Sequence, residues 1–73
     1  MEKRSITIAK HKTSISLERE YWDMIDHISL EKKVSLSGMI ELIDRQKTGT
    51  NLASEIRIYV LNYLLELSKK SLV

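Results

Sequence analysis

Residues 12–17 read Lys-Thr-Ser-Ile-Ser-Leu, and this stretch decides the fold. Side chains of a β-strand alternate between its two faces, so Thr13, Ile15 and Leu17 are expected to share one face. The other face carries Lys12, Ser14 and Ser16. A strand that is apolar on one face and polar on the other is half-buried. It also needs a partner strand, because one strand cannot satisfy its own backbone hydrogen-bonding groups.

Upstream, the sequence Ser-Ile-Thr-Ile at residues 5–8 also alternates, but its isoleucines are even-numbered, whereas the apolar residues of the later stretch are odd-numbered. One straight strand through both stretches would therefore have mixed faces, and a break is needed between Ala9 and His11. We expect residues 1–9 to form an N-terminal arm, with a short extra strand as the alternative. Residues 10–70 are expected to form the folded domain.

Downstream, the apolar spacing changes from that of a strand to that of a helix, and the chain contains no proline. Three helices are predicted: one over residues 18–33, a short one that starts at Ser35 or Ser37 and ends near Gln46, and one that Asn51 caps and that ends near Lys70. The loop before the third helix is expected at residues 47–50. The predicted fold is mainly α with one short β-strand.

The third predicted helix is apolar on two nearly opposite sides. One side carries Leu52, Ile56, Tyr59, Val60, Tyr63 and Leu67, and the other carries Ile58, Leu61 and Leu65. Both sides must be covered, one by the first two helices and the other, most economically, by a second subunit. The predicted dimer interface consists of this second side, with Ile58, Leu61 and Leu65, and of Ile15 and Leu17 on the strand that needs a partner.

The composition limits the classes of protein that this chain can belong to. Its 73 residues form one small domain, with 42% hydrophobic residues but no Phe and a single Trp, so the core of one copy would be thin. The absence of Cys excludes disulfides and thiolate catalysis. Since no apolar stretch approaches the roughly 20 residues of a membrane span, and the N-terminus lacks a signal-peptide pattern, we expect a soluble cytoplasmic protein that has no membrane partner.

Residues for catalysis or metal binding are scarce. There is no Gly-rich phosphate loop and no nucleophile elbow, and His11 and His27 lie 16 positions apart with no obvious third ligand. We expect no catalytic residues, no metal site and no cofactor.

Residues 1–12 carry four basic side chains and Glu2, a net charge of +3, so the remaining residues sum to −1. A local basic end is compatible with a partner that bears phosphates.

The chain resembles the ribbon-helix-helix (MetJ/Arc-type) DNA-binding superfamily, and most closely a branch of small bacterial domains. Two segments carry the resemblance: His-Lys-Thr-Ser-Ile-Ser-Leu-Glu at residues 11–18, which leads into a helix bearing Trp22, and Asn-Leu-Ala-Ser-Glu-Ile-Arg at residues 51–57. The resemblance implies a homodimer in which two copies of the strand pair as an antiparallel ribbon. Three helices follow the strand in this chain, whereas the simplest members have two, so we expect an additional C-terminal helix. Such a ribbon fits a DNA major groove.

The resemblance places Lys12, Ser14 and Ser16 where family members read base edges, and it places residues 35–37, with Ser35 and Ser37, where a helix start holds a phosphate. Lys10, Arg4 and Lys3 are expected to add phosphate contacts. Alternatively, Asn51 and Ser54 face phosphate and residues 34–47 are an insertion. Because serine hydrogen-bonds to several bases, base discrimination should be weak.

We therefore expect a non-catalytic dimer, with the option of a higher oligomer, that binds double-stranded DNA as a transcriptional repressor or an antitoxin-like autoregulator. The alternative is a protein-interaction module of the same fold that does not bind DNA and docks a protein partner at the third helix. DNA binding must weaken steeply with salt, whereas an apolar docking surface should be nearly indifferent to it.

Overall fold

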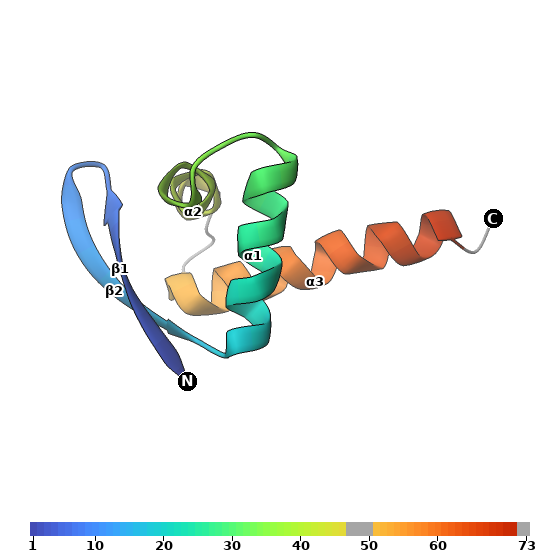
Figure 1. The fold of residues 1–73 in the computed structure, drawn as a ribbon, viewed down its shortest axis with the longest axis horizontal. Helices are drawn as coiled ribbons and strands as arrows, with labels where there is room; N and C mark the ends of the chain where they lie inside the picture. The colour runs from blue at the N-terminus through green and yellow to red at the C-terminus, as the bar shows by residue number, and fades with distance from the viewer. Residues whose placement is uncertain (47–50, 72–73) are drawn as a thin grey trace.

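The computed structural model describes residues 1–46 and 51–71, which form a two-stranded sheet followed by three helices (Figure 1). In chain order, the elements are β1 (Glu2–Ile8), β2 (His11–Leu17), α1 (Arg19–Glu31), α2 (Leu36–Arg45) and α3 (Leu52–Ser71). The predicted fold class is confirmed for the single chain: a two-stranded antiparallel ribbon precedes the helices, and the additional C-terminal helix is α3. The homodimer stays a prediction. The predicted loop at residues 47–50 lies outside the described residues.

The ribbon differs from the prediction in the origin of its second strand. Residues 1–9, expected as an arm, contain β1, which pairs antiparallel with β2 of the same chain from Glu2↔Leu17 to Ile8↔His11. The alternative of an extra strand is therefore the correct one. β1 gives β2 its hydrogen-bonding partner along one edge, so the need for a partner strand does not by itself require a second copy.

A two-residue turn joins the strands and resolves the conflict between even and odd positions. Ala9 and Lys10 both have positive φ, 50° and 71°, as the two-residue turns that match strand twist require. Because Ile8 pairs with His11 across this turn, the even-numbered side chains of β1 share a face with the odd-numbered side chains of β2. Ile6 and Ile15 therefore lie on the same side of the hairpin.

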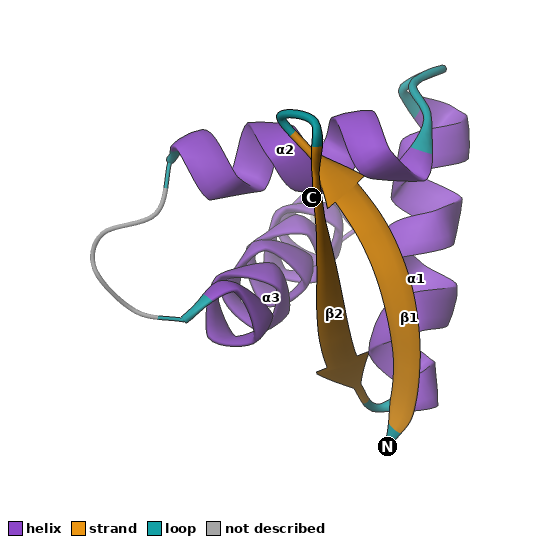
Figure 2. Ribbon diagram, turned by 90° about the vertical axis from the view of Figure 1, so that its left-hand side faces the viewer, coloured by secondary structure: helices purple, strands orange, loops and turns teal. Residues whose placement is uncertain are grey.

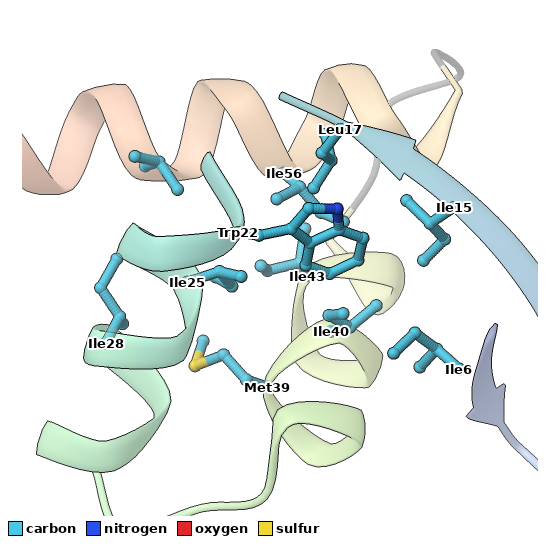
Figure 3. Packing of buried hydrophobic residues seen from close by; sticks show 11 residues of the cluster. Ile6, Ile15, Leu17, Trp22, Ile25, Ile28, Met39, Ile40, Ile43 and Ile56 are labelled. Carbon is cyan, nitrogen blue, oxygen red and sulfur yellow. The ribbon is translucent and has the colours of Figure 1, made fainter. Parts of the chain in front are cut away.

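The core lies between the inner face of this hairpin and the three helices (Figures 2 and 3). Trp22 of α1 is fully buried at its centre, and its indole Nε1 donates a 2.7 Å hydrogen bond to the backbone oxygen of Glu2. The other buried apolar side chains are Ile6, Ile15, Leu17, Ile25, Ile28, Met39, Ile40, Ile43, Ile56 and Val60. One chain thus buries its own Ile15 and Leu17 without a partner.

The helix ends follow the predicted capping residues. Ser35 caps α2 by accepting a hydrogen bond from the N–H of Gly38 at 3.0 Å, and Asn51 caps α3 by accepting one from the N–H of Ser54 at 2.9 Å. At the end of α1, Lys33 takes the left-handed conformation with φ 60°, and Val34 donates its N–H to the carbonyl of Ser29. This C-terminal arrangement usually contains glycine.

The start of α1 is tied to α3 by an ion pair. The guanidinium of Arg57 donates to both carboxylate oxygens of Glu18, at 2.9 and 3.2 Å. These hydrogen bonds lower the pKa of Glu18.

No helix within residues 1–46 and 51–71 is long and apolar enough to cross a membrane.

The lowered pKa of Glu18 predicts a specific loss of stability in acid. A carboxylate with a lower pKa in the folded state stabilises that state above the unfolded pKa, about 4.3, and loses this contribution as the pH falls through the folded pKa. The free energy of unfolding of the Glu18→Gln variant should therefore depend less on pH below about 4.3 than that of the wild type. Urea titrations from pH 6 to pH 3 measure this, and parallel curves for the two proteins would show that the pair contributes nothing.

Candidate nucleic-acid interface

Figure 2 shows the hairpin in front of the helices, with its outer face turned away from them. The side chains of this outer face are all polar. β1 contributes Lys3, Ser5 and Thr7, and β2 contributes Lys12, Ser14 and Ser16. Across the strands, these residues pair as Lys3↔Ser16, Ser5↔Ser14 and Thr7↔Lys12. Their side chains are exposed, except for the half-buried Ser16. We call these six residues the hairpin face.

The hairpin face combines positive charge with short side chains. Its lysines lie on different strands near opposite ends of the hairpin, with four hydroxyl side chains making up the rest of the face. It carries no carboxylate, since Glu2 belongs to the opposite face. Short hydroxyl side chains allow close approach of a surface that bears hydrogen-bonding groups, and the lysines add attraction for anions.

Lys10 extends this positive charge to the tip of the hairpin. Its φ of 71° is a conformation that costs an L-residue about 1 to 2 kcal/mol and that glycine adopts without strain. Strained backbone often accompanies a functional side chain. Lys10 is therefore a candidate contact residue, together with Lys3 and Lys12.

Arg4 is the predicted contact residue that the structure places on the inner face. Its guanidinium donates to both oxygens of Asp26, at 3.0 and 3.1 Å, and lies 4.6 Å from the centroid of the Trp22 ring. The hydrogen bond to Asp26 is the main reason why the pKa of Arg4 is raised. Arg4 thus fastens β1 to α1, and we leave it out of the candidate interface.

Of the two helix starts considered for phosphate contact, that of α3 lies beside the ribbon. Residues 13–16 of β2 and residues 51–53 line one shared hollow of roughly 430 Å³. Ser35 and Ser37 instead begin α2, just after the end of α1. This arrangement favours the alternative in which Asn51 and Ser54 approach phosphate next to the strand.

The sequence reasoning missed Ser5 and Thr7, although it recognised the alternation of residues 5–8. The missing information was the turn: once Ile8 pairs with His11, the register places Ser5 opposite Ser14 and Thr7 opposite Lys12. A two-residue break between two alternating stretches is the signal of a hairpin. The pair Ala9 and Lys10 hid it, because such turns normally contain Asn, Asp or Gly.

The predicted dimer contacts fall into two groups. Ile15 and Leu17 belong to the core of the chain itself, whereas Ile58, Leu61 and Leu65 are about half exposed on α3.

Among the described residues, no group of three or more His, Asp or Glu side chains could hold a metal ion.

One family comparison agrees with this geometry. A family model described as a ribbon-helix-helix domain matches residues 1–64, which include the hairpin, the first two helices and more than half of α3. No curated protein and no solved structure matches the chain significantly.

Proposed function

Since the chain belongs to the ribbon-helix-helix domain family, whose members generally dimerise and bind DNA as transcription regulators, we propose that it binds double-stranded DNA through the hairpin face. The finer role that we propose is that of a non-catalytic transcriptional repressor or antitoxin-like autoregulator in the bacterial cytoplasm. The observation that carries the proposal is the hairpin face itself, two strands wide, basic and free of carboxylates.

The dimensions of this ribbon support groove binding. The major groove of B-DNA, about 12 Å wide, admits a two-stranded β-ribbon, and neighbouring strands are about 4.8 Å apart. The hydroxyls of Ser5 and Ser14, paired at the middle of the hairpin face, can donate to or accept from several bases. Lys3 and Lys12 lie nearer the two ends, where phosphates flank the groove. We infer affinity that is largely electrostatic and base discrimination that is modest.

Selection of genomic fragments with the purified protein tests the proposal. Recovery of a common site, bound with an affinity that falls steeply as salt rises, is the expected result. Failure to recover any enriched fragment, together with a weak and salt-independent interaction with DNA, would refute it. That outcome would leave the protein-interaction module as the better account of the fold.

Two lysines with the same backbone conformation offer a matched comparison. Lys10→Gly and Lys33→Gly each remove one charge and one left-handed lysine, so each should raise the free energy of unfolding by about 0.5 to 1 kcal/mol. Only Lys10→Gly should weaken DNA binding, lowering the slope of log affinity against log salt by about 0.9 for each phosphate that the variant no longer neutralises. Urea unfolding and fluorescence anisotropy measure the two effects. Equal DNA affinities for the two variants would exclude the tip of the hairpin from the interface.

A further inference from the structure

The two strands of the hairpin repeat each other in sequence. Residues 2–8 read Glu-Lys-Arg-Ser-Ile-Thr-Ile, and residues 11–17 read His-Lys-Thr-Ser-Ile-Ser-Leu. When the first stretch is aligned with the second position by position, a lysine, a serine and an isoleucine are identical. Two further positions are similar, since Thr aligns with Ser and Ile with Leu. The hairpin thus contains nearly the same strand twice.

The register of the hairpin converts this repeat into a two-fold symmetry. Ser5 pairs with Ser14 at the middle of the ribbon, and the two strands lie side by side in opposite directions (Figure 2). A half-turn about an axis through this central pair, perpendicular to the ribbon, exchanges the two antiparallel strands. It moves Lys3 to the place of Lys12, which is also its equivalent in the sequence repeat. The repeat and the register therefore define the same symmetry.

The symmetry is closer on the outer face of the ribbon than on the inner face. On the hairpin face, all the residues that the half-turn exchanges are identical or similar: Lys3 with Lys12, Ser5 with Ser14, and Thr7 with Ser16. On the inner face, two exchanges join residues of different chemistry: Glu2 with His11, and Arg4 with Thr13. The dissimilar residues of the repeat all belong to the inner face.

Contacts with the helices explain the inner face but not the outer one. Arg4 binds Asp26 and lies over the Trp22 ring, and the helices that provide these contacts have no two-fold symmetry. Strand alternation explains why the hairpin face is polar. It does not explain why a lysine and a serine recur at symmetry-related positions, where Lys3 and Lys12 are both exposed. The symmetry of the hairpin face therefore matches a partner outside the chain.

Double-stranded DNA has the matching symmetry. Because its two strands run antiparallel, a half-turn about an axis perpendicular to the double helix exchanges their backbones, and the symmetry of a DNA site mirrors that of the protein that binds it. We propose that the ribbon of one chain binds with its symmetry axis on such an axis of the DNA, so that β1 and β2 contact equivalent bases on opposite strands. The DNA element under each ribbon is then a short inverted repeat. This inference rests on the proposed DNA binding and adds the symmetry of the target.

The register also gives the size of this inverted repeat. Lys12 lies opposite Thr7, which is four residues from Lys3. The two lysines are therefore about 14 Å apart along the ribbon, at about 3.4 Å per residue. At about 3.4 Å per base pair, this length corresponds to about four base pairs. Two ribbons of a dimer would instead relate half-sites about 34 Å apart, so symmetry within a single half-site comes from the hairpin alone.

Selection from a pool of random duplexes tests the symmetry of the target. The enriched sites should contain an inverted repeat of about four base pairs, either alone or within each of two half-sites. Enriched sites in which the element under each ribbon is asymmetric would overturn the inference and leave the proposed DNA binding intact. Absence of any enriched site would overturn both. The two failures are therefore distinguishable.

The symmetry-related lysines provide a matched pair of variants. Lys3→Ala and Lys12→Ala should each lose about three- to tenfold in affinity for the selected duplex, and the two losses should agree within about twofold. Fluorescence anisotropy measures the affinities, and circular dichroism checks that both variants fold. A large loss for one variant and none for the other would overturn the inference. Wild-type affinity for both would overturn it too, because the symmetric face would then not contact DNA.

The orientation of the bound ribbon gives the sharpest test. The chain has no natural Cys, so Ala9→Cys, at the exposed turn, can carry an iron chelate that cleaves nearby DNA. The probe is the selected duplex with one half of its inverted repeat changed. Because either strand of a symmetric face can contact the retained half, cleavage should occur at both ends of the element. Cleavage by the bound protein at one end only would show that β1 and β2 are not equivalent and would overturn the inference.

Discussion

Replacing Ile15 with lysine is expected to unfold the chain. Ile15 is only 4% exposed and packs inside the core that surrounds Trp22. A lysine there would lie directly opposite Arg4, and the carboxylate of Glu2, a diagonal neighbour on this face, already lies 3.8 Å from the guanidinium of Arg4. A buried charge that is unpaired and faces a like charge is strongly destabilising. The whole stability of a domain of this size is only about 4 to 11 kcal/mol, so the loss should exceed what the fold can tolerate.

Ser14→Lys is the matched control, because Ser14 is the preceding residue and lies on the hairpin face. This variant should fold with the helicity of the wild type and should bind DNA more tightly, since it adds a positive charge to the proposed interface. Far-ultraviolet circular dichroism with thermal unfolding compares the two variants. A folded Ile15→Lys variant with native helicity would mean that the two faces of β2 are assigned the wrong way round.

The faces of β2 could be predicted from the sequence because strand alternation is a local property that six residues are enough to reveal. The helix caps at Ser35 and Asn51 could be predicted for the same reason, since each depends on a side chain and an N–H three residues later. The partner of β2 could not, because the turn at Ala9 and Lys10 lacks the residues that usually identify such turns.

The role of Arg4 depended on contacts that sequence proximity does not reveal. Asp26 lies 22 positions away, and only the packing of the hairpin on α1 brings its carboxylate to the guanidinium. From the sequence alone, Arg4 was indistinguishable from the neighbouring Lys3 as a contributor to a basic end. The register separates them, since Lys3 belongs to the hairpin face and Arg4 to the inner face.

The second large effect is expected when both lysines of the hairpin face are removed. The double variant Lys3→Ala/Lys12→Ala should lose about 10- to 100-fold in DNA affinity at low salt, because each lysine contributes a contact to a phosphate or a base edge. Phosphate contacts would weaken binding to all sequences alike. A base contact from Lys12 would also reduce discrimination between a selected site and a scrambled duplex, by about 1 to 3 kcal/mol. Helicity should not change, since both side chains are exposed.

Lys32→Ala/Lys33→Ala provides the control for total charge. It also removes two positive charges, but from the exposed residues that follow α1, away from the hairpin. Any difference between the two double variants in DNA binding must therefore come from the position of the charges. Nonspecific attraction to DNA would weaken equally in both.

The most direct test of the hairpin face as a DNA-binding surface is a salt titration by fluorescence anisotropy of the wild type and these two double variants on one selected duplex. The slope of log affinity against log salt should fall by about two for each Lys3→Ala/Lys12→Ala chain that contacts DNA, and it should stay at the wild-type value for Lys32→Ala/Lys33→Ala. Identical slopes for all three proteins would contradict the account and remove the hairpin face from DNA recognition.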